Sequence, residues 1–484
     1  MKTKRLAFII LKRGLQGIGG LVVLILIALI SILIMDSFQT SFLKMDNQPK
    51  ADLNSYIIRN VNIVPMTSDT VLTNSSVTIK NGLISSIGDT SNLENLAEID
   101  ARGGFLSPGL TDMHVHVWDK YELGLYLANG VTAIRNLWGQ PMHLRIKKEV
   151  IENEIAAPMF FTSTPKLTGP QFIGDDNTNL TDPNEAKEKI ISFKERGFDF
   201  IKTYSGLTEE LFEAILRQAA ISNMDIVAHP TPEVPYEYHF NPQIITIEHA
   251  EEFVQQPLNY QLDTTKLNEI VEGYVANTHA TLSPTLIVYY NIYNMLRNDT
   301  ILSSEDLNYM NPLIRMVDSQ AQYDRWNGTK IQDATVTKRI KDQHDFHLLI
   351  IKKLYDKGVN IVCGTDAGIG ITLPGFSIHQ ELEFYRKAGM SNYDVLKTAT
   401  VNPSKTHKFL NNLGSVEVGK TANLLILDTN PLEELKALQN PKMVFVKGRK
   451  INHEQLNQFK EKAKNRSNLL ATALRYAEYL LLER

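Results

Sequence analysis

The stretch Leu110-Thr-Asp-Met-His-Val-His116 follows the turn signal Ser107-Pro-Gly109 and decides the fold that we expect for this chain. Alternate side chains of a β-strand lie on the same face, so His114 and His116 are expected to project together. Two neutral imidazoles held side by side suit Zn²⁺ or a similar divalent ion. An H-x-H pair also occurs by chance on half-exposed strands, so this pair alone leaves a structural role open.

Further residues that can bind a metal follow this pair in order, each in or at the end of a β-like run. They are Lys202 in Phe200-Ile-Lys-Thr-Tyr204, His229 in Ile226-Val-Ala-His229, His249 in Ile247-Glu-His249 and Asp366 in Gly364-Thr-Asp366. Enzymes built on parallel barrels keep their chemistry at the carboxyl ends of the strands, which is where these residues are placed. The order therefore predicts one metal centre.

Apolar β-like runs alternate with helical patterns between Leu106 and about Leu413, which predicts an α/β fold with a parallel sheet covered by helices. Helical periodicity is plain in Asn184–Arg196, Thr208–Ser222 and Lys338–Lys357. The predicted strands are Leu110–His116, Val131–Asn136, Met159–Thr162, Asp199–Thr203, Asp225–His229, Ile244–His249, Ala280–Ser283 and Asn360–Asp366. Eight such strands predict a (β/α)₈ TIM barrel, which takes about 250 residues.

Short β-like runs separated by turn residues lie on both sides of this region. Those between Ser55 and Phe105 are too few to close a fold alone, and Ala422–Leu427 and Met443–Val446 have the same character. We expect the two ends to pair into one small β-sandwich with the barrel inserted between them. The expected domains are 1–36, 52–105 with 413–452, 106–412 with an insertion at about 286–336, and a C-terminal helix at 453–484.

The N-terminus carries five basic residues before an uncharged segment, Gly14–Met35. A helix of this length matches the roughly 30 Å hydrocarbon core of a bilayer. We expect a single-pass anchor with a cytoplasmic N-terminus, a polar tether over Asp36–Asp52, and a catalytic domain that is periplasmic or extracellular. The alternative is a cleaved signal peptide, although no convincing small-x-small site follows Met35.

Composition limits the classes of partner. The formal net charge is −4 and no basic block dominates, so the chain lacks the electrostatic footprint of a nucleic-acid-binding protein. The sole cysteine, Cys363, excludes an intrachain disulfide and is expected to be a buried core thiol. The hydrophobic content of 43% is typical of a globular protein with a sizeable core. A homo-oligomer stays open.

The order H-x-H, Lys, His, His, Asp resembles that of the amidohydrolase superfamily, in its binuclear-metal branch with a carboxylated lysine. The most similar group is the imidazolonepropionase-like and prolidase-like hydrolases. The resemblance runs from roughly Ile57 to Asn452, and it includes Leu413-Gly-Ser-Val-Glu-Val-Gly-Lys420 followed by Ala422-Asn-Leu-Leu-Ile-Leu-Asp428. It implies two divalent ions, expected to be zinc, and carbon dioxide bound as a carbamate on Lys202. The implied ligands of one ion are His114, His116 and Asp366, those of the other are His229 and His249, and the carbamate bridges the two ions with a hydroxide.

The resemblance implies a hydrolase that cleaves a C–N bond of a small amide, dipeptide or cyclic amide. Desolvation in a barrel mouth lowers the pKa of a lysine, and the neutral amine can then add carbon dioxide, whereas the alternative for Lys202 is a simple ion pair with a carboxylate. Asp366 is implied to act as general base and then as general acid toward the leaving nitrogen. Tyr204 is carried over as a contact of the substrate carboxylate, and His143 is a second candidate for substrate binding.

Two departures from the family leave the substrate open. The segment Leu167-Thr-Gly-Pro-Gln-Phe172 lacks the Gly-Gly-His of imidazolonepropionase-like relatives, and Asn136 stands where Thr-x-Arg-Asp supplies an aspartate. A lactonase, esterase or phosphotriesterase can use the same metal centre, because fold does not decide the bond. A bridging lysine argues against a mononuclear deaminase. An anchored binding protein without activity is the alternative from another class, and the intact set of six ligands argues against it.

Two further segments receive expectations. Tyr289 to about Val336 is longer than a normal βα connection and rich in aromatic residues, which favours a lid or a pocket wall over a surface insertion or a membrane contact. The helix-like tail from His453 to Arg484 is expected to pack on the body or on another subunit, with no catalytic role.

Overall fold

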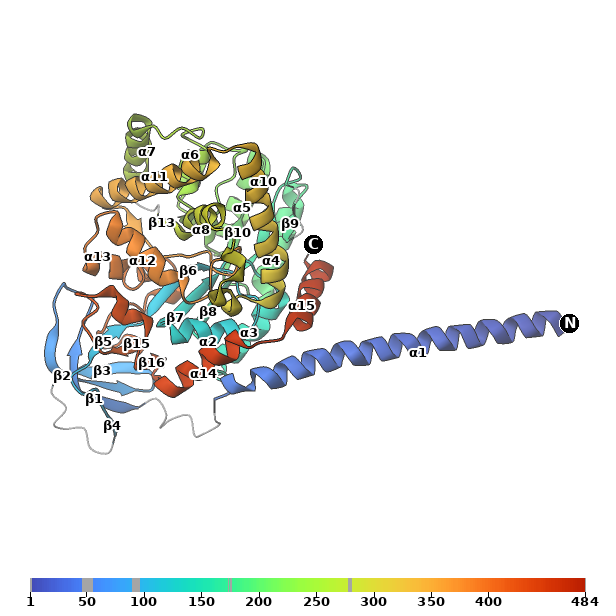
Figure 1. Ribbon diagram of the computed structural model, residues 1–484, viewed down its shortest axis with the longest axis horizontal. Helices are drawn as coiled ribbons and strands as arrows, with labels where there is room; N and C mark the ends of the chain where they lie inside the picture. The colour runs from blue at the N-terminus through green and yellow to red at the C-terminus, as the bar shows by residue number, and fades with distance from the viewer. Residues whose placement is uncertain are drawn as a thin grey trace.

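The computed structural model describes residues 2–45, 55–88, 96–172, 174, 176–276 and 281–483. Part of the predicted tether, from 46 to 52, lies outside these residues. Within them the chain forms two sheets, helices that surround the second sheet, and one long N-terminal helix (Figure 1).

The first sheet joins segments from both ends of the chain. Its strands are β1 (Tyr56–Ile63), β2 (Leu72–Lys80), β3 (Leu83–Ile87), β4 (Ala97–Asp100), β5 (Phe105–Pro108), β15 (Leu424–Leu427), β16 (Met443–Val446) and β17 (Arg449–Asn452). The order is β17-β16-β15-β5-β1-β2-β3, with β4 paired to β1. Strand β15 runs antiparallel to β5, with Leu424 opposite Pro108. Buried residues of both segments, among them Ile58 and Phe445, share one apolar cluster.

The second sheet is parallel and holds the H-x-H stretch. Its strands are β6 (Leu110–Val115), β7 (Val131–Asn136), β8 (Met159–Thr168), β10 (Phe200–Thr203), β11 (Ile226–Ala228), β12 (Ile244–Glu248), β13 (Thr281–Ser283) and β14 (Asn360–Ile361), with β9 (Asn177–Asn179) beside β8. The order is β14-β13-β12-β11-β10-β8-β7-β6. Past β14, the Met113 amide donates to the Cys363 carbonyl at 2.8 Å and the His116 amide donates to the Ala367 carbonyl at 2.7 Å. The structure therefore shows an α/β fold with a curled parallel sheet.

The strand boundaries differ from the predicted ones by more than one residue at two places. Strand β8 extends to Thr168, six residues beyond the predicted end, because β9 pairs with its second half. Strand β14 is shorter than predicted and ends at Ile361, since the chain after it bonds to β6 and reaches a left-handed backbone at Asp366, with φ of +58°. Ala280, the predicted start of β13, lies outside the described residues. Cys363 is buried, as expected.

Helices cover the second sheet. They are α2 (Tyr121–Ala128), α3 (Pro141–Ile151), α4 (Pro183–Arg196), α5 (Glu209–Ser222), α6 (Glu251–Gln255), α7 (Thr264–Ala276), α11 (Val336–Asp356), α12 (Ser377–Lys387) and α13 (Asn392–Thr398). Among them, α4, α5 and α11 lie where helical periodicity predicted helices. Local signals set their ends. Asp182 caps α4 by accepting from the amides of Asn184 and Glu185, and Gly197 ends the helix in the left-handed region.

The insertion after β13 folds into helices of its own: α8 (Ile287–Arg297), α9 (Pro312–Ile314) and α10 (Gln320–Gln332). A separate apolar cluster holds it together, and this cluster includes Ile292, Leu296, Leu307 and Ile340 from α11. Two short helical segments connect α8 to α9, η3 (Ile301–Ser303) and η4 (Glu305–Tyr309). The insertion is therefore a packed subdomain on one side of the sheet.

The N-terminal helix α1 (Lys2–Gln39) projects away from the body (Figure 1). Its segment Leu15–Leu43 has a window of mean hydropathy 3.1, and it is the one described helix that is long and apolar enough to cross a membrane. By itself this is a weak indication of an anchor or a signal sequence. The start of the predicted tether is wrong: α1 continues to Gln39 and η1 (Thr40–Leu43) follows.

The C-terminal tail forms α14 (His453–Lys464) and α15 (Leu469–Leu482). Both helices pack on the body near the end of α1 (Figure 1). An ion pair joins Arg475 of α15 to the buried Asp36 of α1. The tail thus contacts both the body and the N-terminal helix α1.

Candidate active site

One cavity of about 760 Å³ is lined by all six residues that the sequence predicts as metal ligands: His114, His116, Lys202, His229, His249 and Asp366. These residues lie in or directly after strands β6, β10, β11 and β12, or in the segment after β14. The separate stretches of sequence that were predicted to meet therefore line one cavity.

His114, His116 and Asp366 form the tightest group. Asp366 Oδ1 lies 3.1 Å from His114 Nε2 and 2.7 Å from His116 Nε2, and the three potential ligand atoms lie within 4.8 Å of one another. Burial raises the pKa of Asp366, but the charge of His114 and hydrogen bonds from both imidazoles outweigh it and hold that pKa well below its usual value. This His/His/Asp group could hold a metal ion.

The backbone around this group is shaped for close approach. A Cβ on Gly364 would lie 2.8 Å from the Cβ of His114 and 2.4 Å from the Ser283 hydroxyl, so a side chain there would push the neighbouring segments apart. Asp366 and His249 both have a positive φ, +58° and +70°. Left-handed conformations are costly for residues other than glycine and cluster at functional sites. The fold therefore holds these two side chains in place against a local preference.

His229 and His249 face each other next to the first group. Their ring centroids are 4.7 Å apart, and the His249 ring is 4.8 Å from that of His114. His249 Nδ1 lies 2.8 Å from the Thr285 hydroxyl, which leaves Nε2 for another partner. His229 Nδ1 is buried without a hydrogen-bond partner among the described residues, and its Nε2 lies 3.4 Å from Glu252 Oε1. An orphaned imidazole nitrogen in a cavity is a natural metal ligand.

Lys202 is buried, with 1% of its surface exposed, and within the described part of the chain its Nζ has no hydrogen-bond partner. The predicted alternative of a lysine paired with a carboxylate is therefore not what these residues show. Burial lowers the pKa of Lys202 to about 8, against the opposing charges of Glu248 and Asp366. A lowered pKa makes the neutral amine accessible near neutral pH.

A buried network that the sequence did not predict supports His114 from behind. Glu248 is fully buried and accepts from His114 Nδ1 at 2.7 Å, Arg135 Nη2 at 2.7 Å and the Thr246 hydroxyl at 2.5 Å. Burial raises the pKa of Glu248, but the Arg135 charge and the His114 hydrogen bond lower it far more. A carboxylate on one imidazole nitrogen fixes the tautomer and aims the other nitrogen into the site. The pair Glu248-His249 in the sequence was the available signal.

Arg135 extends this network across the interior of the sheet. Its Nε donates to the Met113 carbonyl at 2.6 Å, and its Nη1 lies 3.1 Å from His407 Nε2. His407 Nδ1 lies 2.7 Å from Asp225 Oδ2, whose side chain is 38% exposed. The fully buried Arg135 guanidinium thus connects Glu248, behind the predicted metal site, to His407 and the partly exposed Asp225.

The two predicted substrate-binding residues have different environments. Tyr204 lines the cavity, with its ring centroid 4.3 Å from that of His229. His143 is fully buried, its Nε2 donates to the Val117 carbonyl at 2.8 Å and its Nδ1 accepts from the Gln140 amide at 3.0 Å. Among the described residues that line the cavity, His143 is absent. Its place is in the N-terminal cap of α3.

Residues that the sequence reasoning missed form much of the cavity wall. Trp118, Trp138 and Lys166 of β8 line it without having been predicted to do so. The insertion contributes residues of α8, α9 and α10, which agrees with the expected pocket wall. The tail also contributes, through Ala473 and Tyr476 of α15, although no role at the site was expected for it.

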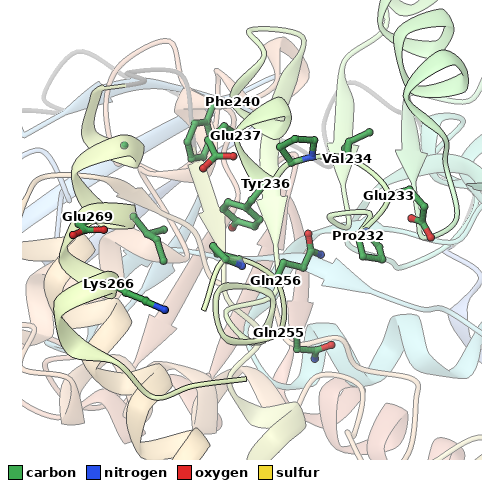
Figure 2. A pocket seen from close by; sticks show the side chains of 14 residues that line it. Pro232, Glu233, Val234, Tyr236, Glu237, Phe240, Gln255, Gln256, Lys266 and Glu269 are labelled. Carbon is green, nitrogen blue, oxygen red and sulfur yellow. The ribbon is translucent and has the colours of Figure 1, made fainter. Parts of the chain in front are cut away.

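A second cavity, of about 820 Å³, lies between the segment after β11 and helix α7 (Figure 2). Pro232, Tyr236 and Phe240 line one side of it, and Lys266 and Glu269 line the other. None of the six candidate ligands lines this cavity. This second cavity is therefore separate from the candidate active site, although Gln255 lines both.

Known proteins resemble parts of the chain at the level of sequence. Residues 328–451 match the amidohydrolase family model. Ochratoxinase from Aspergillus niger is 34% identical over 102 residues, which are 21% of this chain and 20% of that protein. Adenine deaminase from Listeria welshimeri is 39% identical over 94 residues, 18% of this chain and 15% of that protein. The chain thus aligns with a fifth or less of the length of these curated relatives.

Solved structures resemble the chain over most of its length. Bottromycin amidohydrolase has a TM-score of 0.71 at 20% identity and covers 88% of this chain and 96% of its own. A Xaa-Pro dipeptidase with bound methionine has a TM-score of 0.62 at 19% identity and covers 82% and 100%. The ochratoxinase of A. niger has a TM-score of 0.59 at 18% identity and covers 83% and 95%. At these identities the likeness shows the fold alone. Together with the family match, it confirms the predicted resemblance of this chain to the amidohydrolase superfamily.

Proposed function

We propose that this chain is a metal-dependent hydrolase that cleaves a C–N bond of a small amide, dipeptide or cyclic amide. The observation that carries the proposal is the meeting of six candidate ligands in one cavity around the unpaired amine of Lys202. The family match and the amide-cleaving relatives support it. The contacts within the site support the same chemistry independently of the family match and the relatives.

The proposal includes a complete barrel. The hydrogen bonds between β6 and the segment 362–367 support closure of the parallel sheet into a (β/α)₈ barrel. In this proposal the barrel spans 106–412, with its insertion at about 286–336, and carries the sheet of 52–105 and 413–452 beside it. Residues 1–36 form a membrane anchor, with a cytoplasmic N-terminus and a periplasmic or extracellular catalytic domain, and 453–484 pack on the body.

The donor set fits two divalent ions, because four imidazoles, a carboxylate and the Lys202 amine line one cavity, and His229 Nδ1 and Lys202 Nζ have no hydrogen-bond partner among the described residues. We assign His114, His116 and Asp366 to one ion, His229 and His249 to the other, and the carbamate of Lys202 to both. Zinc is the ion that this donor set favours. Bound there, the ions supply Lewis acidity that polarises the scissile carbonyl and lowers the pKa of the attacking water.

The residues of the chain then divide the remaining work. The Asp366 carboxylate accepts the proton of the attacking water and donates it to the leaving nitrogen, since an amine leaves far more readily than an amide anion. Glu248 holds the His114 ring in the required tautomer. Tyr204 lies at the cavity wall next to His229, where it can contact the substrate.

The test combines metal content with bond selectivity. Full-length protein, purified in detergent without chelators, is expected to contain close to two divalent ions per chain by elemental analysis and to hydrolyse members of a panel of small amides, dipeptides and cyclic amides. A matched panel of lactones, carboxylic esters and phosphotriesters serves as the comparison. One ion or none in active protein would contradict the binuclear assignment, and activity confined to the matched panel would move the function to ester-type bonds.

A further inference from the structure

The wall of the candidate active site contains a cation that the proposed chemistry leaves unused. Lys166 of β8 stands directly opposite Lys202 of β10 in the parallel pairing, so both side chains lie on the same side of the sheet. Only 7% of its surface is exposed, and it lines the cavity with the six candidate ligands. A lysine is rarely buried to this extent unless its charge is paired or used.

Two aromatic faces and one acid surround the ammonium of Lys166. Its Nζ lies 4.9 Å from the centroid of the Tyr204 ring and 5.7 Å from that of Trp138, and it donates to the Asp176 carboxylate. An ammonium has three donors, and ring faces hold a cation without accepting strong hydrogen bonds. Asp176 is itself 34% exposed and lines the same cavity. Lys166 therefore retains donors that an anion entering the cavity can use.

The other charged lining residues do not offer an equivalent site. Arg325 is exposed at α10, and Asp318 already accepts from the Gly370 amide and from Gln322. Glu251, two residues after His249, is an acid and so provides no cation. Lys166 is thus the buried cation among the described lining residues outside the candidate ligands.

The opposite wall has a different character. Strands β8 and β13 are four places apart in the order of eight, so the insertion after β13 faces Lys166 across the site. The apolar lining residues of this wall are Val288, Ile292, Leu313, Val317 and Trp326, and the polar residues Asp318, Gln322 and Arg325 lie beside them. The cavity volume of about 760 Å³ is within the range of small-molecule sites and accommodates a ring.

We propose that the substrate presents a carboxylate to Lys166 and an apolar ring to the insertion wall, with the scissile C–N bond between them. The inference rests on the proposed function and narrows its substrate to N-acylated amino acids or amides of that shape, charged at one end and apolar at the other. Lys166 then determines specificity: it contacts the substrate and takes no part in proton transfer.

The tryptophans provide a binding assay that needs no turnover. Because all three of them line this cavity, intrinsic fluorescence reports what enters it. We would titrate the full-length, metal-loaded protein in detergent by stopped flow with N-benzoylglycine, N-benzoylglycinamide, which lacks the carboxylate, and N-acetylglycine, which lacks the ring. N-benzoylglycine is expected to bind at least about tenfold more tightly than either, the scale of one charge-assisted hydrogen bond or one buried ring.

Variants at both partners of the ion pair sharpen the test. Lys166→Met should bring the affinities for the acid and its amide within about twofold, and Lys166→Arg should keep part of the difference. Asp176→Asn should tighten binding of the acid more than that of the amide, because it removes a competitor for Lys166. This prediction does not depend on whether the Lys166→Met variant is stable. Lys338→Met is the matched control, since Lys338 is 79% exposed in a surface ion pair near the start of α11 and does not line the cavity.

The possible results separate this inference from the proposed function. Equal binding of the acid and the amide, or an unchanged ratio in Lys166→Met and Asp176→Asn, would overturn the carboxylate site. Hydrolysis that favours uncharged amides would keep the function and also overturn the inference. Selective binding of N-benzoylglycine by a protein that cleaves no C–N bond would support the site and refute the function.

Discussion

Replacing Glu248 with glutamine tests whether the buried network behind His114 controls metal binding. The carboxylate is fully buried and accepts from His114, Arg135 and Thr246 at 2.5–2.7 Å. Glutamine has nearly the same volume, so packing is preserved, but it carries no charge and turns an amide N–H₂ toward one of these donors. The substitution therefore changes electrostatics and hydrogen bonding with little change of shape.

The magnitude follows from what each partner loses. Removing one partner of a buried ion pair costs about 3–5 kcal/mol. We expect the lower end, about 3 kcal/mol of unfolding free energy, because Arg135 keeps its bonds to the Met113 carbonyl and the Thr246 hydroxyl. Loss of the acceptor on His114 Nδ1 frees the ring orientation, and changes of this kind reduce metal affinity about 10- to 100-fold.

A double variant separates the two effects. Denaturant unfolding of the metal-free protein gives the stability change, and competition with a fluorescent chelator gives zinc affinity. In Glu248→Gln/Arg135→Met the unpaired charge is gone, so stability should partly recover while zinc affinity stays low. Asp225→Asn, at the 38% exposed end of the network, is the control and should change zinc affinity less than threefold. Zinc affinity within twofold of the parent in Glu248→Gln would refute the positioning role.

Four further predictions address the ligands and the anchor. Asp366→Asn should lose about 10²–10⁴-fold in rate, because an amide cannot carry the proton, with metal content measured alongside since Asp366 is also an assigned ligand; a rate within a few-fold of the parent would remove it from the mechanism. Lys202→Ala should lose metal and turnover together and recover some activity with added acetate. In the parent, burial lowers the Lys202 pKa to about 8, so the fraction of neutral amine falls from about one half at pH 8 to about one in a hundred at pH 6. Reconstitution of metal-free protein with metal at fixed dissolved carbon dioxide should therefore slow as the pH is lowered across that range. A rate independent of pH and carbon dioxide would contradict carbamate formation. Protein that begins at Asp36 should be soluble and melt at a higher temperature than protein that begins at Asp52, and equal melting temperatures would show that residues 36–45 do not support the body.

The candidate ligands could be predicted because their signals are local. His114 and His116 are two residues apart on one strand, and the others sit in or at the ends of apolar runs, so residue type and strand alternation place each of them. The supporting network has a weaker signal, because Glu248 stands directly before His249 but the sequence does not pair it with Arg135. Glu248 and Arg135 are 113 positions apart and meet only because β7 and β12 contribute to the same interior. Buried ion pairs of this kind depend on the tertiary fold, which a single sequence does not reveal.

The cavity wall was predictable in part for a related reason. An aromatic insertion after a strand of a parallel barrel lies near the active-site face, and the structure places α8 and α10 there. Lys166 was hidden because the predicted strand ended at Thr162, four residues before it, whereas β8 continues to Thr168 by pairing with β9. The amphipathic pattern of the tail indicates that one face of α15 is buried but carries no information on its partner.

The end of α1 shows how composition alone can misplace a boundary. Asp36 and Thr40 are polar, which favours a tether, yet both are buried against the body. Leu43 is fully buried, and its carbonyl accepts from the Ala156 amide at 2.7 Å. The partner of Asp36 is Arg475, one residue before Tyr476, which lines the candidate active site. The segment after the apolar span is therefore part of the body. Helix α15 holds this segment on the body and also lines the candidate active site, so a change at Asp36 is expected to alter substrate binding through α15.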